Sequence, residues 1–409
     1  MTRPVVGVIA EYNPFHNGHA LHIGRIREKL PGAVVVCVMS GHVTQRGDLA
    51  ICRKQARAAM AIRGGADLAL ELPALYACSA AEGFARAGVS LLAATGVVTY
   101  LSFGSEIGRL DLLDHAARTL DGQAFISAQD AVLKQGLSYP AARQKALATL
   151  EPASAAALDG PNDILGVEYL RALRYLGSDI TPLVIPREGA FHDAAYDDIN
   201  GPAGRLASAS YIRERWLDGR DAHGFIPDET RTLWEFECAA GRAPVSLISC
   251  ESALLAALRR MCAEDFKALP DVSEGLEYRL ARAASRAISL EEFYTLVKTK
   301  RYTHARIRRV ALRAYMDLPR SSTAAPSYLR VLAANQTGLI LLRDIKKKTA
   351  LPILTKPAHV RRMGKTALGC FIHEARVTDL YALCYPERTQ WIGGQEWKVD
   401  PAIIGDNNG

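Results

Sequence analysis

The segment from Val5 to His22 constrains the fold more than any other part of this chain. An apolar, β-branched run, Val5 to Ala10, leads into a turn that contains Pro14 and then into His16-Asn17-Gly18-His19. Such a run followed by a proline turn and a helical pattern predicts a strand, a tight turn and a helix start. Backbone N–H groups at a helix N-terminus attract anions. The sequence therefore predicts a phosphate site directly after the first strand.

The first half of the chain repeats this alternation of short apolar runs and helical patterns. Runs typical of buried strands occupy Val5 to Ala10, Ala33 to Met39, Asp67 to Leu72, Val97 to Phe103 and Ile180 to Ile185. Helical patterns occupy His19 to Leu30, Asp48 to Arg63, Leu75 to Ala94 and Asn162 to Leu176. We expect an α/β, Rossmann-like parallel sheet with helices on both faces, which binds its ligand outside the carboxyl ends of the strands. The loops at those ends are Glu11 to Gly18, Ser40 to Gly47, Gly104 to Glu106 and Pro186 to Gly189.

Two polar breaks divide the 409 residues, which exceed the length of one typical domain. The first break, 218–224, is short and contains glycine, and the pattern after it is helical, with a capping box formed by Ser289 and Glu292. The second break runs from Pro319 to Pro326, and the strand-like piece Pro352 to Thr355 follows it. We therefore predict an α/β domain over 1–217, a helical basic region over 228–320 and a small α+β subdomain over 327–409.

Composition restricts the class of protein. Hydrophobic residues make up 49% of the chain and charged residues 23%, as expected for a folded protein, and the net charge of +7 permits a nucleic-acid partner. The eight cysteines form no Cys-x-x-Cys pair, which favours reduced, buried thiols over a disulfide framework or a zinc site. No signal peptide or membrane-length apolar run is visible, so we expect a cytoplasmic protein without a membrane partner.

Three histidines, His16, His19 and His22, follow the first strand at helical spacing, beside Gly18. Imidazole N–H groups can donate to phosphate oxygens that gain charge in a transition state. Two alternatives remain: ordinary histidines at a helix start, or a His-x-x-His zinc site, although no Glu or Cys partner is adjacent. We predict no bound metal from these residues alone.

A second segment could complete the phosphate site. Ser208, Ser210 and Arg213 lie at a predicted helix start near the end of the α/β half, and their hydroxyls and guanidinium could hold further phosphates. The alternative is an ordinary serine N-cap.

Asn-Pro-Phe-His-Asn-Gly-His, 13–19, resembles the first signature of the HIGH-type α/β nucleotidyltransferases, and Ala207 to Arg213 is similar to their second. More of the chain resembles one narrower family, the tRNA(Met) cytidine acetate ligases. The similar pieces are Glu11 to His19, Met39 to Gly41, Gln45 to Gly47, Ala66 to Leu68, Glu71 to Pro73, Ser102 to Glu106, Pro161 to Gly166, Lys300 to Thr303 and Leu329 to Leu332.

This resemblance implies an ATP-dependent ligase. The expected reaction joins acetate to the α-phosphate of ATP, releases pyrophosphate, and transfers the acetyl group to N4 of the wobble cytidine of elongator tRNA(Met), with Mg²⁺ on the phosphates. His16 and His19 are the expected catalytic residues. The resemblance assigns ATP contacts to Gly7, Val8, Ile9, Ala10, Glu11, Tyr12, Asn13, Pro14, Phe15, His16, Asn17, Gly18, His19, Ala20, Gly104, Asn162 and Arg187.

Local chemistry supports the last three positions. Gly104 would let a base or ribose lie against the backbone. The Asn162 amide could read a nucleotide edge, or be a plain helix cap. Arg187 follows the last strand of the α/β half, or is an ordinary surface arginine.

The densest basic segment runs from Lys298 to Arg313 without an acidic residue and predicts an amphipathic helix with a cationic side. We expect tRNA contacts from Lys300, Arg301, Arg306 and Arg309, and note further basic runs at Lys346 to Lys348 and at Arg361, Arg362 and Lys365. A solvated charged face is the alternative.

The acetate carboxylate requires a cation, for which Arg46, Lys54 and Arg57 are candidates. Two other functions remain open: an adenylyltransferase that makes a dinucleotide-type cofactor, and a noncatalytic RNA-binding protein.

Overall fold

The computed structural model describes residues 3–187, 205–273, 275–320 and 325–405. In this part of the chain, β1 (Val5–Ala10), β2 (Val34–Ser40), β3 (Leu68–Leu72), β4 (Tyr100–Ser105) and β5 (Thr181–Pro186) pair in parallel. Their order in the sheet is β5-β4-β1-β2-β3, and it confirms the predicted α/β fold, with each strand within three residues of its expected start. Glu188 and Gly189, part of one expected loop, lie outside the described residues, as do 321–324 in the second expected break.

The α-helices of the described residues are α1 (Asn17–Lys29), α2 (Lys54–Arg63), α3 (Ala74–Ala77), α4 (Ala81–Ala94), α5 (Leu110–Leu120), α6 (Gln123–Leu133), α7 (Tyr139–Leu150), α8 (Pro161–Tyr175), α9 (Ala209–Leu217), α10 (Asp228–Ala239), α11 (Glu251–Arg259), α12 (Ala263–Ala268), α13 (Leu276–Arg286), α14 (Leu290–Val297), α15 (His304–Met316), α16 (Gln336–Lys348) and α17 (Lys365–Ala382). The helical segment predicted from Asp48 begins only at Lys54, because Val43 and Leu49 form a β-bridge before it. The segment predicted over Leu75 to Ala94 divides into α3 and α4.

Side chains alternate between two apolar cores on opposite faces of the sheet. Val34, Val36 and Val38 of β2 face the core that includes α4 and α8, whereas Val35 and Cys37 face the core that includes α1 and α2. This period of two is the normal geometry of a strand. Because both faces are covered, the strands are apolar on both sides, which is why they read as continuous apolar runs.

The last part of the chain returns to the sheet. β6 (Leu329–Ala334) pairs antiparallel with β3, and β7 (Ile353–Leu354) and β8 (Ala402–Ile403) pair with β6. Residues 327–409, for which the sequence predicts a separate subdomain, thus contribute three strands to the main sheet. The strand-like piece Pro352 to Thr355 corresponds to β7.

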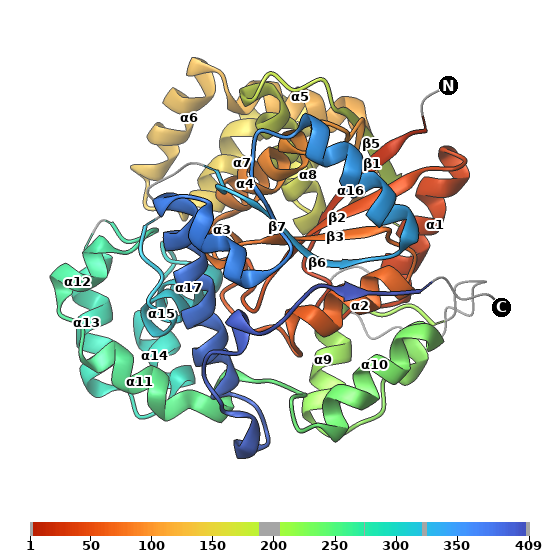
Figure 1. Ribbon diagram of the computed structural model, residues 1–409. Helices are drawn as coiled ribbons and strands as arrows, with labels where there is room; N and C mark the ends of the chain where they lie inside the picture. The colour runs from red at the N-terminus through yellow and green to blue at the C-terminus, as the bar shows by residue number, and fades with distance from the viewer. Residues whose placement is uncertain (1–2, 188–204, 274, 321–324, 406–409) are drawn as a thin grey trace.

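The helices of the predicted region 228–320 lie in two places (Figure 1). α11 to α15 gather beside α17, whereas α10 packs against α2 near α9. Ser289 begins α14 and its Oγ accepts from the Glu292 N–H at 3.1 Å, as the sequence predicts.

One disulfide joins the helical lobe to the chain after α17. Cys250 and Cys384 are bonded, with their Cα atoms 5.3 Å apart and a separation of 134 positions in the sequence. The prediction of eight reduced thiols is wrong for this pair. α15 packs against both α17 and α11, which brings the two cysteines together, and no spacing in the sequence indicates such a contact.

Candidate active site

A cavity of about 320 Å³ lies at the carboxyl ends of β1, β4 and β5, as expected for a parallel sheet. Its wall is made by the end of β1 and the first turns of α1, α8 and α9. Most of the predicted site residues line it: Val8, Ile9, Ala10, Glu11, Tyr12, Asn13, His16, Gly18, His19, His22, Gly104, Asn162, Arg187, Ser208, Ser210 and Arg213. Segments about 200 residues apart in the sequence therefore form one site.

The first turn of α1 fixes the orientation of two histidine rings. The N-cap residue is His16, and its Nδ1 accepts from the Gly18 N–H at 3.1 Å. Reciprocally, Nδ1 of His19 accepts from the His16 N–H at 3.2 Å. Because each Nδ1 is an acceptor, the ring proton of each neutral imidazole lies on Nε2. The two rings are stacked, with centroids 3.7 Å apart, and Tyr12 packs edge-on against His19.

The three cavity histidines are held neutral. Burial, with the charges of Arg187 and Arg213, lowers the pKa of His16 to about 3. Burial and Arg187 lower the pKa of His22 to about 4, and burial with the neighbouring imidazoles and Arg187 lowers that of His19. His16 and His19 can therefore donate through Nε2–H across the physiological pH range without carrying charge.

Protein stability should fall as the pH is lowered from about 6.5 to 5. An unfolded histidine, with a pKa near 6.5, binds a proton in this window, whereas His16, His19 and His22 in the folded state do not, so the free energy of unfolding rises with pH here. We expect a loss of about 1–2 kcal/mol per histidine at pH 5. Urea unfolding followed by circular dichroism at pH 5 and pH 7 measures it. A His22→Gln variant should show a shallower dependence, and equal stability at both pH values would contradict the assignment.

The start of α9 forms the opposite wall of the cavity. Ser208 is the N-cap: its Oγ accepts from the Tyr211 N–H at 3.2 Å and lies 3.0 Å from the Ser210 Oγ. Ser208 is thus an ordinary serine N-cap, which was the simpler alternative for this segment. It is also part of the cavity wall. Arg213 donates from Nη1 to the Asn13 carbonyl oxygen at 2.6 Å, which ties α9 to the turn after β1.

The third wall is built around Glu106, which the sequence did not single out as a site residue. The carboxylate of Glu106 accepts from the N–H groups of Asn162 and Asp163 at 3.3 and 2.9 Å, and so caps α8. The Asn162 side chain also donates from Nδ2 to Glu106 Oε1. The N-cap position itself is Gly160, so Asn162 is not the helix cap. Gly104 lies under the stem of Arg187, whose Cγ would be 3.3 Å from a Cβ at position 104.

Of the three cations considered for a carboxylate, only Arg46 lines the cavity. Lys54 is fully buried elsewhere, with Nζ 2.5 Å from Glu71 Oε1 and 2.7 Å from Glu396 Oε1. Arg57 is also fully buried, and its guanidinium donates to backbone carbonyl oxygens, among them that of Ser40 at 3.1 Å. Lys54 and Arg57 are therefore structural.

Five residues of the predicted ATP-binding segment do not line the cavity: Gly7, Pro14, Phe15, Asn17 and Ala20. A Cβ on Gly7 would lie 2.6 Å from Leu92 Cδ1 of α4, so this glycine permits helix packing. Phe15 fills the core against Gly64. Asn17 donates from Nδ2 to the carbonyl oxygens of Arg205 and Gly224 at 3.0 and 3.2 Å, and so anchors the segments before and after α9.

The basic face predicted for α15 is mostly buried. Arg309 is 8% exposed and donates from Nε to Asp271 Oδ2 at 2.9 Å. Arg313 is 2% exposed and donates to the carbonyl oxygens of Leu75 and Cys78 at 2.7 Å. Arg306 donates from Nε to the Asp271 carbonyl oxygen at 2.6 Å. The expectation of an RNA contact from Arg309 is thus contradicted by its burial, whereas Lys300 and Arg301 are exposed.

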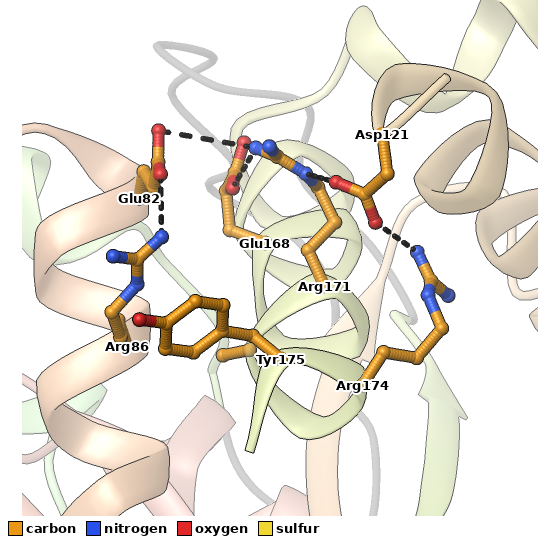
Figure 2. A pocket seen from close by; sticks show the side chains of 8 residues that line it. Glu82, Arg86, Asp121, Glu168, Arg171, Arg174 and Tyr175 are labelled. Carbon is orange, nitrogen blue, oxygen red and sulfur yellow. Dashed lines mark hydrogen bonds and ion pairs between the residues drawn. The ribbon is translucent and has the colours of Figure 1, made fainter. Parts of the chain in front are cut away.

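A second hollow, of about 350 Å³, lies between α4, α5 and α8 (Figure 2). Its cations are paired: Arg171 with Asp121 and Glu168, Arg174 with Asp121, and Arg86 with Glu82. This hollow is consequently an ion-pair network that joins three helices, not a second anion site.

Within the described ranges of the chain, no group of three or more His, Cys, Asp or Glu side chains is arranged to hold a metal ion. Nor does any described helix combine the length and the apolar character needed to cross a membrane.

Comparison with known proteins gives full-length matches. The family model for the HIGH Nucleotidyl Transferase family matches residues 3–396. A tRNA(Met) cytidine acetate ligase of Thermoanaerobacter sp. (strain X514) is 36% identical over 393 residues, which cover 93% of this chain and 95% of the relative. The corresponding protein of Acetivibrio thermocellus is 37% identical over 420 residues, with coverage of 98% and 100%.

Two solved structures have the same fold throughout. The crystal structure of Thermotoga maritima TmcAL bound with alpha-thio ATP has a TM-score of 0.90, and that of the apo protein a TM-score of 0.92. Both are 33% identical in sequence, and each comparison covers 98% of this chain and 100% of the other.

Proposed function

Because this chain belongs to the HIGH nucleotidyl transferase family and, within it, to the tRNA(Met) cytidine acetate ligases, we propose that it activates acetate with ATP and acetylates a cytidine of tRNA(Met). The observation that carries the proposal is the pair of neutral imidazoles, His16 and His19, with Nε2–H donors in the cavity at the N-terminus of α1. A structural relative at 33% identity is described as bound with alpha-thio ATP, which supports ATP as the nucleotide.

In the first step, an acetate oxygen forms a bond to the α-phosphorus of ATP while the bond from that phosphorus to the bridging oxygen breaks, and pyrophosphate leaves. His16 and His19 donate to the phosphate oxygens on which charge develops, and this stabilises the transition state. Arg213, with the hydroxyls of Ser208 and Ser210, holds the departing phosphates at the start of α9.

In the second step, N4 of the wobble cytidine forms a bond to the acetyl carbon. The bond from that carbon to the AMP oxygen breaks, and N4 loses a proton.

Arg46, the one candidate of the three that lines the cavity, is our proposed partner for the acetate carboxylate. The compartment we propose is the cytoplasm, where tRNA is found.

Mg²⁺ would enter with the triphosphate. It commonly binds through one or two carboxylates plus substrate phosphates and water rather than through an all-protein cage. The cavity wall fits that pattern, since it offers the Glu11 carboxylate. The ion would neutralise phosphate charge.

The Glu106–Asn162 pair gives a physical reason for choosing adenine. Asn162 donates from Nδ2 to Glu106 Oε1, so the amide oxygen is left for the cavity. An acceptor in this wall favours the exocyclic amine of adenine over the carbonyl oxygen of guanine.

Substitution Glu106→Gln should weaken this choice. A glutamine can donate to Asn162 Oδ1 and so turn the amide, which then presents Nδ2 to the base. Loss of a hydrogen bond worth about 1.4 kcal/mol weakens the binding of ATP about tenfold. We therefore expect the KM for ATP to rise about tenfold, with a smaller change in kcat. Pyrophosphate release with ATP and with GTP measures the discrimination. Unchanged discrimination in a variant with a wild-type melting temperature would refute the role of Glu106.

Pyrophosphate release with ATP and acetate, with and without tRNA(Met), tests the proposed function, together with mass spectrometry of the tRNA nucleosides. We expect tRNA-dependent formation of N4-acetylcytidine. Turnover only with a mononucleotide phosphate would indicate a small-molecule adenylyltransferase, and RNA binding without any turnover would indicate a noncatalytic protein.

A further inference from the structure

We propose that the outward face of α13 is the surface that binds the tRNA, a proposal that rests on the proposed function. Along this helix Leu276, Leu280, Ala283 and Ala284 are buried. The residues turned outward are Tyr278, Arg279, Arg282, Ser285 and Arg286. The only acidic side chain of α13, Glu277, is 8% exposed. The exposed face therefore carries three guanidinium groups and an aromatic ring without a carboxylate.

Neither Arg282 nor Arg286 forms an ion pair with any residue that the structure describes. This differs from the hollow between α4, α5 and α8, where each arginine faces acidic partners (Figure 2). Unpaired cations on a surface attract a polyanion, whose bound counterions they release.

The cationic surface continues past both ends of α13. Arg279 donates from Nε to the Val297 carbonyl oxygen at 2.9 Å, which places it beside the loop that holds the exposed Lys300. Arg259 of α11 donates from Nη2 to the carbonyl oxygen of Ala287, directly after α13, at 2.8 Å. An 11-residue helix is about 16 Å long, so the face can contact several phosphates in succession.

A chain of contacts links α13 to the catalytic cavity. The turn before α13 contains Asp271, which accepts from Arg309 at 2.9 Å, and Arg309 Nη1 in turn donates to the Gln45 carbonyl oxygen at 3.4 Å. Gln45 lines the cavity. In Figure 1 the helices α11 to α15 form one lobe beside α17. RNA on α13 would therefore lie on the lobe whose Arg309 contacts the Gln45 loop of the cavity.

The basic run at the end of α16 lies at the other end of the sheet. A Cβ on Gly96 would be 2.8 Å from Lys348 Cβ, and Gly96 precedes the amino end of β4. The catalytic cavity lies at the carboxyl ends of the strands. Lys346 and Lys348 therefore provide a matched control, since they carry the same charge on an exposed helix away from the site.

RNA fits this face better than an acidic protein does. Arginine contacts phosphates and also stacks on bases, and Tyr278, 65% exposed, can stack on an unpaired loop base. A wobble cytidine belongs to such a loop.

The test compares Arg282→Ala/Arg286→Ala with the control Lys346→Ala/Lys348→Ala. Binding of a tRNA(Met) transcript is measured by fluorescence anisotropy between 50 and 300 mM KCl, and acetate-dependent ATP–pyrophosphate exchange is measured without tRNA. We expect the arginine variant to bind at least tenfold more weakly, with a salt slope lower by about 1–2, and to exchange pyrophosphate at the wild-type rate. Tyr278→Ala should weaken binding without changing the slope.

Wild-type affinity and slope in the arginine variant would overturn the proposal and leave the proposed function intact. A wild-type protein that neither exchanges pyrophosphate nor acetylates tRNA would overturn the proposed function and the RNA surface with it. Equal competition by polyglutamate at the same ionic strength would identify the face as a site for acidic protein and reject the RNA assignment.

Discussion

Substitution His19→Ala should lower the rate of acetyl-adenylate formation by about 10²–10³-fold, the usual effect of removing one donor to a developing negative charge. His19 lines the cavity, and its Nδ1 is occupied by the His16 N–H, so its Nε2–H is the group that the reaction can use. Pyrophosphate release under saturating ATP and acetate measures the loss. The affinity for tRNA should stay within about twofold, since α13 lies on another lobe.

The same substitution removes a helix cap, and a second variant separates the two effects. In His19→Asn, the side-chain oxygen can take the place of Nδ1 and accept from the His16 N–H, but the shorter side chain does not reach the position of Nε2. We expect wild-type stability with a rate as low as that of His19→Ala. Recovery of most of the rate in His19→Asn would show that capping, not donation to phosphate, is the role of His19. The exposed His115 of α5 provides a neutral control.

The largest effect on stability should follow Lys54→Met. Lys54 and Arg330 are buried beside the carboxylates of Glu71 and Glu396. Burial and the neighbouring carboxylates raise the pKa of Glu374, the third acid of the cluster. The two cations, Lys54 and Arg330, face the carboxylates of Glu71 and Glu396. Removal of Lys54 leaves a buried negative charge without a partner, which costs about 3–5 kcal/mol.

Urea unfolding measures this cost, and two comparisons define its origin. Lys347→Met removes a lysine that is paired with Asp344 on the surface, and should change the free energy of unfolding by less than about 0.5 kcal/mol. Lys54→Met combined with Glu396→Gln restores the balance of charge and should recover part of the loss. A loss below 1 kcal/mol in Lys54→Met would show that the cluster does not depend on its charges.

The sequence was most informative where structure and chemistry are local. The apolar runs predicted the five strands β1 to β5, and the order strand, proline turn, histidine located the cavity, because the residues that define it are neighbours in the chain. β6 was missed as a strand, since its antiparallel pairing with β3 depends on residues more than 250 positions away.

The basic residues of α15 show why charge patterns alone mislead. Three arginines on one helix face look the same whether they meet RNA or, as Arg309 and Arg313 do, the Asp271 carboxylate and backbone carbonyl oxygens of the same protein. Glu106 was missed for a similar reason: its role depends on the position of α8, 56 residues later. By contrast, the spacing of Tyr278, Arg282 and Arg286 on α13 was visible in the sequence, but these residues lie too far apart to form a dense basic run.

The antiparallel strand β6, which lies between β3 and β7 in the sheet, has a consequence for how the protein is made. A ribosome releases β3 long before residues 329–334, and until then the strand exposes an unpaired edge of the kind that promotes aggregation. The part of the chain that forms the nucleotide cavity therefore cannot complete its sheet until residues 329–334 have been synthesised. We do not expect that part to fold on its own within a fusion protein. Any shortened version that ends before Leu329 should need a chaperone or a supplied peptide to remain in solution.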